Sequence, residues 1–237
     1  HQHLKKPGTT ITGKSMSNAK TQILIVDDHP MMRQGLASLI ENEPDLEVCG
    51  EAGDAAEALR LVEQCKPNLV LTDITLPDKN GIELLKDILA LHPACSAIVI
   101  SMHDESLYAE RVLRAGGRGY IMKQEGGKKI MEGIRKVLGG QIAVSDKMSA
   151  KILEIFSGRR PDSNNGLVEN LTDREFEVFQ LIGKGMDSKQ IASQLHLSPK
   201  TIDVHRSNIK AKLKITSMTE LIRYAVRWVE SEARNER

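Results

Sequence analysis

Residues 22–140 alternate short apolar runs with amphipathic stretches, and this alternation restricts the possible folds more than any other feature. The apolar runs stand at 23–26, 46–50, 69–72, 97–101 and 119–122. Between them, apolar side chains recur at the spacing of a helix. Nearly continuous apolar strands that alternate with helices are typical of a parallel sheet covered on both faces. We therefore predict an α/β doubly wound domain of five βα units over residues 19–140.

The pattern after residue 170 is helical only. Thr172 and Glu175 have the spacing of a capping box, so a helix is expected to begin there and to end near Gly183 and Gly185. Three further helical segments follow, at 188–197, 198–213 and 217–230. Residues 171–237 are therefore predicted to form a small all-α domain of four helices with a helix-turn-helix.

The two predicted domains are joined by residues 141–170. The segment 146–156 has a helical pattern, whereas 157–170 is rich in Gly, Pro, Ser and Asn and shows no core pattern. A helix followed by a flexible linker is expected there. Residues 1–18 have no apolar periodicity and resemble an expression tag and a disordered N-terminus, with Met16 as the native start.

Charge is distributed unevenly over the chain, although the net charge is only +1. Residues 19–140 carry 14 basic and 19 acidic side chains, whereas 198–216 carry five basic and one acidic. This division predicts two domains with different partners. No apolar run approaches the roughly 20 residues of a membrane span. The three cysteines are too few and too widely spaced for a disulfide framework or a zinc site, which favours a cytoplasmic location.

Three carboxylates stand at the ends of predicted strands. Asp27 and Asp28 follow the first strand and Asp73 follows the third. In a sheet of order 2-1-3-4-5 these two strand ends are adjacent, at the point where ligands bind. Two carboxylates about 4 Å apart repel by roughly 4 kcal/mol at an effective dielectric constant of 20, so the cluster needs a cation. An all-oxygen site accessible to water suits Mg²⁺.

Two further strand ends carry a hydroxyl and an ammonium group. Ser101 closes the fourth strand and Lys123 follows the fifth. Together with a metal-bound carboxylate, these groups form a site for a tetrahedral anion. Each residue alone is also compatible with an ordinary solvated turn.

The segment 198–213 reads as the second helix of a helix-turn-helix, with Ser198 as N-cap and Pro199 as first residue. A helical projection places Ile202, Ile209 and Leu213 on the core side. The opposite face carries small and polar residues around Val204, which suits a major-groove surface. The same pattern also fits an ordinary amphipathic helix with a solvated lysine face, and composition does not decide between the two.

Four segments at the strand ends carry a family resemblance: DDHP (27–30), TDITLPDKNG (72–81), SMHD (101–104) and GYIMK (119–123). Over residues 20–140 the chain resembles the receiver domain of two-component response regulators. The resemblance implies that Asp73 accepts a phosphoryl group from a sensor-kinase histidine. It also implies supporting roles: Asp28, Asp73 and the Thr75 carbonyl bind Mg²⁺, Asp27 acts through water, Lys123 and Ser101 bind the phosphate, and Tyr120 is the switch aromatic.

The segment LTDREFEVFQLIGKG and the helix-turn-helix that follows it resemble the DNA-binding domain of NarL/FixJ (LuxR-type) regulators over residues 168–230. Departures from that pattern include Ser188, where Asn is usual. His205 is expected to be a structural residue, and the last helix resembles the dimerisation helix of the family. The resemblance and the helical projection together predict the DNA-contacting residues Lys200, Thr201, Asp203, Val204, Ser207, Asn208, Lys210, Lys212 and Lys214.

The sequence therefore predicts a cytoplasmic bacterial transcription regulator, not an enzyme, controlled by phosphorylation. Its expected partners are a sensor histidine kinase, double-stranded DNA and a second copy of itself, with no membrane. One alternative is a Mg²⁺-dependent phosphatase-like enzyme that uses Asp73, but that class needs a DxD pair and leaves 168–230 without a role. The other is an orphan regulator that acts without phosphorylation, for which a damaged pocket would be the marker.

Overall fold

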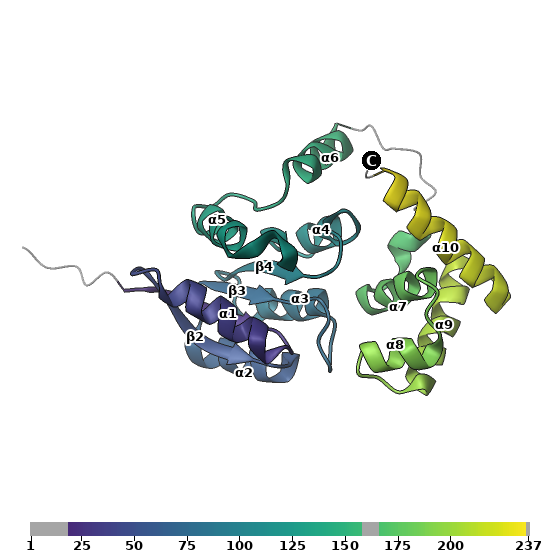
Figure 1. Cartoon of the computed structure of the whole chain (residues 1–237), viewed down its shortest axis with the longest axis horizontal. Coiled ribbons are helices and arrows are strands. Elements are labelled where there is room, and N and C mark those ends of the chain that lie inside the picture. Colours follow the sequence, from purple (N-terminus) through teal and green to yellow (C-terminus); the bar gives the residue numbers. More distant parts are fainter. Residues whose placement is uncertain (1–18, 158–165, 236–237) are drawn as a thin grey trace, which may run out of the picture.

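The computed structural model describes residues 19–157 and 166–235, which form two domains that pack side by side (Figure 1). The N-terminal domain is a sheet with helices on both faces, and the C-terminal domain is helical, so both predicted fold classes are confirmed. The predicted tag at 1–18 lies outside the described residues.

A parallel five-stranded sheet of order β2-β1-β3-β4-β5 forms the centre of the N-terminal domain. This is the predicted order. Residues in the interior strand β1, such as Leu24, are fully buried because helices cover both faces. The strands are β1 (Thr21–Val26), β2 (Leu46–Ala52), β3 (Leu69–Thr72), β4 (Ser96–Ser101) and β5 (Gly119–Met122).

Helices α1 (Pro30–Glu41) and α5 (Gly126–Leu138) share one apolar cluster on one face of the sheet. Helices α2 (Ala55–Cys65), α3 (Gly81–Leu91) and α4 (Glu105–Arg114) cover the other face. The side chains of Asp54, Asn80 and Asp104 accept hydrogen bonds from the first turns of α2, α3 and α4. These polar N-caps satisfy backbone N–H groups that have no partner within the helix.

The connection between the domains contains α6 (Asp146–Phe156), which packs on α4, and the 3₁₀ turn η2 (Val168–Asn170). Another 3₁₀ turn, η1 (Lys123–Glu125), lies between β5 and α5. Helix α6 was expected. The segment 157–170 shows no core pattern in the sequence, but Val168 within it is 2% exposed. Val168 belongs to an apolar cluster with residues of the C-terminal domain, so the end of the connection is part of that core.

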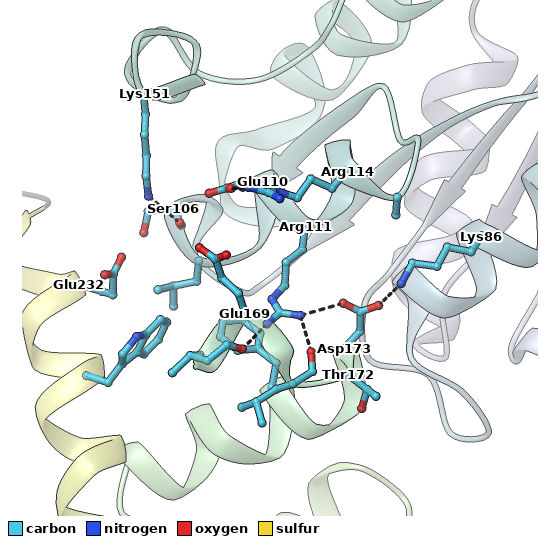
Figure 2. Close-up of a pocket in the computed structure, with 16 residues that line it drawn as sticks. Lys86, Ser106, Glu110, Arg111, Arg114, Lys151, Glu169, Thr172, Asp173 and Glu232 are labelled. Carbon is cyan, nitrogen blue, oxygen red and sulfur yellow. Dashed lines mark hydrogen bonds and ion pairs between the residues drawn. The ribbon is translucent and has the colours of Figure 1, made fainter. Parts of the chain in front are cut away.

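The C-terminal domain consists of α7 (Asp173–Gly183), α8 (Ser188–Gln194), α9 (Pro199–Leu213) and α10 (Met218–Asn235). The capping box of Thr172 and Glu175 is present, and Gly185 adopts a positive φ of 83° after the end of α7. The ring of Trp228 on α10 stands edge-on against Phe176 and Phe179 of α7. Helix α7 also lies against α3 and α4 of the N-terminal domain, where the two domains meet (Figure 2).

Within 19–157 and 166–235, no helix combines the length and the hydropathy that crossing a membrane requires.

Candidate functional site

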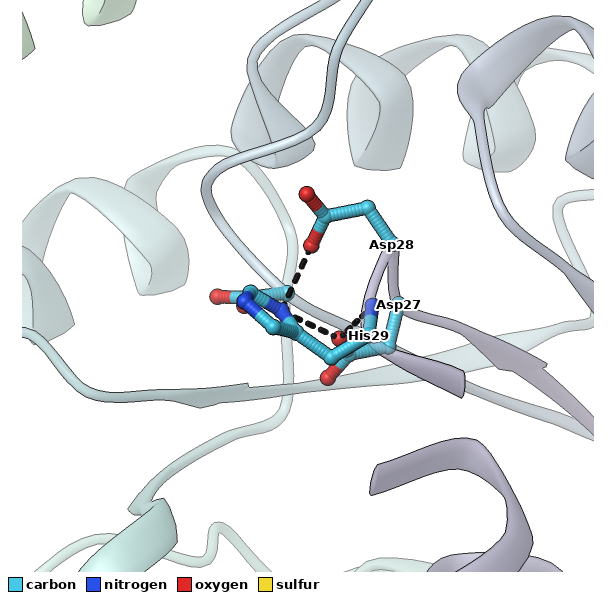
Figure 3. A group of neighbouring side chains, drawn as sticks. Asp27, Asp28 and His29 are labelled. Carbon is cyan, nitrogen blue, oxygen red and sulfur yellow. Dashed lines mark hydrogen bonds and ion pairs between the residues drawn. The ribbon is translucent and has the colours of Figure 1, made fainter. Parts of the chain in front are cut away.

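The acidic pocket lies at the carboxyl ends of β1 and β3. Val26 pairs with Thr72, so the next residues, Asp27 and Asp73, become neighbours. The carboxylates of Asp27, Asp28 and Asp73 and the ring of His29 each bring one atom into a group whose members lie within 4.8 Å of one another. Figure 3 shows the members contributed by the β1 end, Asp27, Asp28 and His29. The predicted convergence of three carboxylates is therefore present.

Each oxygen of the Asp73 carboxylate has its own partner from a different strand end. The hydroxyl of Ser101 donates to Oδ1 at 2.8 Å, and Nζ of Lys123 lies 2.5 Å from Oδ2. Lys123 also lies 2.6 Å from Oδ2 of Asp27. Burial alone would lower the pKa of Lys123, but the charges and hydrogen bonds of Asp73 and Asp27 hold that pKa above its ordinary value. The pocket therefore keeps a cation beside the most buried carboxylates.

The donor set fits a hard divalent cation. Three carboxylates face one lysine, which leaves an excess of negative charge when all four groups are ionised. Oδ1 of Asp28 is buried and makes no hydrogen bond with good geometry to any described residue, although Nδ1 of His29 lies 2.7 Å away. A buried carboxylate oxygen without a proper donor costs free energy that a metal ion offsets. Oxygen ligands of this kind suit Mg²⁺.

The loop between β3 and α3 packs closely against the backbone of Asp73. The N–H of Gly81 donates to the carbonyl oxygen of Ile74 at 2.6 Å. A Cβ atom at Gly81 would lie 1.8 Å from the carbonyl oxygen of Asp73. Only glycine fits this close approach of two backbone segments.

Tyr120 and Thr75 both contact His103, a residue that the sequence analysis did not single out. The Tyr120 hydroxyl donates to the carbonyl of His103 at 2.8 Å, and the tyrosine ring is buried. The hydroxyl of Thr75 lies 3.0 Å from Nε2 of His103. Burial lowers the pKa of His103. The only signal in the sequence was the position of His103 two residues after Ser101.

Helix α9 presents the two faces that the helical projection predicted. Ile202 and Ile209 are fully buried and Leu213 is 4% exposed, whereas Val204 is 53% exposed. The predicted polar contacts surround Val204, and Lys200, Asp203, Ser207, Asn208 and Lys214 are all exposed. Thr201 is half-buried, with its hydroxyl 2.8 Å from that of the N-cap Ser198. An exposed valine among small polar residues is a surface able to read base edges.

Lys212 differs from the other predicted phosphate-binding lysines. Its ammonium lies 2.6 Å from Oε2 of Glu175 on α7, inside the domain. Lys210 is half-buried. Lys214, at the end of the helix, is exposed and has a left-handed φ of 57°. The structure thus separates Lys212, which is ion-paired, from Lys214, which is an exposed residue.

Ser188 has hydrogen-bond partners on α9, and His205 lies partly inside the domain. The hydroxyl of Ser188 donates to Oδ1 of Asp203 at 3.0 Å and accepts from Arg206. The unusual serine therefore links the start of α8 to α9. His205 is half-buried, and burial lowers its pKa.

Both domains match known protein families. Residues 23–135 match the family described as "Response regulator receiver domain", and 169–225 match "Bacterial regulatory proteins, luxR family". The transcriptional regulatory protein LiaR of Bacillus subtilis (strain 168) is 34% identical over 209 residues, which cover 87% of this chain and 97% of LiaR. The chain belongs to the LuxR-type response regulators. The order of domains and the pocket residues at the strand ends agree with this assignment.

Other relatives of this response regulator match one or both of its domains. DegU of Brevibacillus brevis is 29% identical over 92% of this chain and 98% of DegU. A LuxR-family response regulator from Aurantimonas sp. SI85-9A1 is similar in structure over 59% of this chain and 99% of its own, with 34% identity and a TM-score of 0.54. RcsB of Salmonella enterica serovar Typhimurium, in a structure with promoter DNA and a phosphomimetic, matches 87% of this chain and 98% of its own with 25% identity and a TM-score of 0.58.

The receiver and DNA-binding domains of the regulator are held together by Arg111 of α4. Its guanidinium donates to the carbonyls of Val168 and Leu171 and to Oδ1 of Asp173, at 2.9, 3.0 and 3.2 Å (Figure 2). It also lies 4.0 Å from the centre of the Phe176 ring. Lys86 of α3 approaches the other oxygen of Asp173 at 2.7 Å. Beside these contacts lies a cavity of about 320 Å³.

A second interdomain contact reaches the edge of the acidic pocket. Glu177 of α7 is fully buried, and its carboxylate accepts from the Thr75 hydroxyl at 2.7 Å and from the Asn80 amide at 3.1 Å. Arg174 donates to the same carboxylate at 2.8 Å and to the carbonyl of Leu76 at 3.3 Å. Sequence reasoning missed these contacts. The available signal was Asp173, Glu177 and Gln180, polar residues that share one face of α7.

Proposed function

We propose that Asp73 is the phosphoacceptor of this regulator and that its phosphorylation controls DNA binding by α9. The convergence of Ser101 and Lys123 on the two oxygens of Asp73 is the observation that supports the proposal. A hydroxyl, an ammonium and a cluster of carboxylates around one buried acceptor form a site for a phosphoryl group. Phosphate adds about two negative charges, which must be met by donors of this kind.

In the proposed reaction, an oxygen of the Asp73 carboxylate attacks phosphorus and forms an acyl phosphate while the bond from phosphorus to the donor histidine nitrogen breaks. Asp27, Asp28, Asp73 and the Thr75 carbonyl would hold Mg²⁺. When bound, this ion supplies positive charge that offsets the charge of the phosphoryl oxygens. Lys123 pairs with the phosphoryl group, Ser101 hydrogen-bonds it, and Tyr120 follows the movement of Ser101 as the switch aromatic.

For DNA binding, we assign base contacts to the exposed face of α9 and phosphate contacts to its ends. Val204, Ser207 and Asn208 face base edges, with Asp203 and Thr201 beside them. Lys200 at the start of the helix and Lys210 and Lys214 near its end suit phosphates. We do not assign a phosphate contact to Lys212, because its ammonium already pairs with Glu175.

The active form is proposed to be a dimer formed through α10. Ile222 on α10 is 40% exposed, whereas Leu221 and Ala225 of the same helix are fully buried and the helix packs on α7. A dimer of this kind binds two half-sites about one helical turn apart. Because a sensor kinase and DNA are its proposed partners, we propose that the regulator acts in the bacterial cytoplasm.

The test is phosphorylation of the full chain by acetyl phosphate, followed by intact mass and peptide mapping. One acid-stable, base-labile phosphoryl group on Asp73 is expected, and none in Asp73→Asn or with EDTA. Undiminished labelling of Asp73→Asn would refute the assignment. Steady release of inorganic phosphate from many phosphate esters would instead favour the phosphatase-like alternative.

A further inference from the structure

The DNA-binding domain touches the phosphorylation pocket at two separate points. At the first, Glu177 accepts the hydrogen bond of the Thr75 hydroxyl. At the second, Nε2 of His196 lies 3.4 Å from Oδ2 of Asp28. Thr75 and Asp28 both belong to the proposed metal site. Two residues of one domain thus contact two ligand-bearing residues of the other.

His196 reaches the pocket because of its place in the turn between α8 and α9. It has a left-handed φ of 54°, a conformation that non-glycine residues rarely adopt. Its side chain is 52% exposed, so apolar packing does not hold it there. The turn stands three residues before Pro199, the first residue of α9.

The contact of Glu177 continues into the pocket through hydrogen bonds. Thr75 joins Glu177 to His103 at 2.7 and 3.0 Å. The N–H of His103 lies 3.4 Å from the hydroxyl of Ser101, which donates to Asp73. Any movement of Ser101 toward a phosphoryl group therefore changes the surroundings of Thr75 and Glu177.

The interface combines apolar and polar contacts: the rings of Tyr108 and Phe176 pack edge to face across it, and buried polar side chains of α7 lie beside them. Asp173, Glu177 and Gln180 on one face of α7 are at most 5% exposed, and neither amide atom of Gln180 has a hydrogen-bond partner among the described residues. These polar side chains regain water when the domains separate, which reduces the free energy that opening of this part of the interface costs.

We propose that His196 and Glu177 are positioning residues that lower the affinity of the receiver pocket for Mg²⁺ and slow phosphorylation of Asp73, and that DNA relieves this effect. His196 pairs with Oδ2 of Asp28, one of the carboxylates that would hold the metal ion, and Glu177 holds the loop that carries the Thr75 carbonyl. The proposal rests on the function proposed above for Asp73.

DNA relieves the contact because it competes for the same turn. The N-terminal residues of a recognition helix make the base contacts. In this structure the exposed face around Val204 is open, but the preceding turn lies on a receiver edge that carries Asp27, Asp28 and Asp73. DNA phosphates and these carboxylates are both anionic, so a bound duplex draws the turn away from the pocket. Since coupling between sites is reciprocal, DNA then favours metal binding and phosphorylation.

The test uses the full chain with His196→Asn, because asparagine tolerates a positive φ, and with Glu177→Ala. The matched controls are His92→Asn, at the far end of α3, and Glu63→Ala, on the exposed face of α2. Two quantities are measured for each protein: the Kd of Mg²⁺ by calorimetry, and the rate of labelling by phosphoramidate with and without a duplex selected by the protein from a random pool.

We expect His196→Asn to bind Mg²⁺ more tightly than wild type and to be labelled faster. Each change should be on the order of fivefold, the low end of typical allosteric couplings. DNA should accelerate the wild type and both controls by a similar factor, and should accelerate His196→Asn and Glu177→Ala less. An Mg²⁺ Kd and a DNA response of His196→Asn equal to those of wild type would overturn the proposal. If Asp73 were labelled in no protein, the proposed function would fail, and the Mg²⁺ Kd of the variants would still decide whether His196 and Glu177 restrain the pocket.

Discussion

The ammonium of Lys212 on α9 lies 2.6 Å from Oε2 of Glu175 on α7, and Glu175 is only 4% exposed. The same oxygen accepts the backbone N–H of Thr172 at 2.9 Å, so the capping box and the ion pair share one carboxylate. Burial alone would raise the pKa of Glu175, but the hydrogen bonds from Lys212 and Thr172 hold that pKa below its ordinary value. The pair fastens the recognition helix to the first helix of its domain.

Replacing Lys212 by Met is therefore expected to lower the free energy of unfolding by about 1–2 kcal/mol at pH 7, because a buried charged acceptor loses one donor. The folded-state pKa of Glu175 is depressed, so the contribution is present above the ordinary value of 4.5 and is lost as pH falls through the lower folded-state value. Urea unfolding over a range of pH measures this. Lys214→Met, at an exposed position, is the control, and an equal loss for Lys212→Met at all pH values would contradict the account.

The two lysines are also expected to differ in DNA binding. Lys214→Ala should weaken binding to cognate and scrambled duplexes equally and lower the salt slope by about one, since one phosphate contact releases roughly one counterion. Lys212→Ala should leave the salt slope unchanged. Titrations over a range of salt concentration check both, and a reduced slope for Lys212→Ala would restore it as a phosphate contact.

Val204 is expected to contribute specificity. Replacing it by Ala should cost about 1 kcal/mol on the cognate duplex and little on a scrambled one, because only an apolar contact to a base is lost. The measurement is fluorescence anisotropy on both duplexes. If affinity fell equally on the two, the exposed face of α9 would not be the base-reading surface.

Gly81→Ala is expected to distort the loop that packs against the backbone of Asp73. The new Cβ would stand 1.8 Å from the carbonyl oxygen of Asp73, so the loop must move. A strong loss of stability, of about 2 kcal/mol or more, and a slower phosphorylation are expected. Gly35→Ala in α1 is the matched control, because nothing lies within 4 Å of its Cβ, and it should stabilise the helix by up to about 1 kcal/mol. Thermal unfolding of both variants measures the difference.

Much of this molecule could be predicted from its sequence where the determinants are local. Alternating apolar runs predicted the sheet, and the strand ends predicted the meeting of Asp27 and Asp73. The projection of α9 assigned Ile202 and Ile209 to the core. These predictions depend only on periodicity and on the geometry of parallel strands.

The interdomain contacts could not be predicted in the same way. The sequence analysis assigned no contact to Asp173 and Glu177, because their partners Arg111 and Thr75 lie 62 and 102 residues away in the chain. The pairing of Lys212 with Glu175 could not be predicted for a related reason. A helical projection places Lys212 beside the core face of α9, but it does not say which carboxylate the lysine meets. Periodicity assigns a face, whereas the partner depends on how separate elements pack.

The central claim is that phosphorylation of Asp73 controls where and how tightly this regulator binds DNA. The most direct measurement is genome-wide binding of the wild type and of Asp73→Asn in the same cells under conditions that activate the kinase. The account predicts a set of strongly occupied sites with repeated half-sites in the wild type and a marked loss of occupancy at those sites in Asp73→Asn at equal protein level. Equal occupancy of the same sites by both proteins would contradict it and would favour a regulator that binds DNA without phosphorylation.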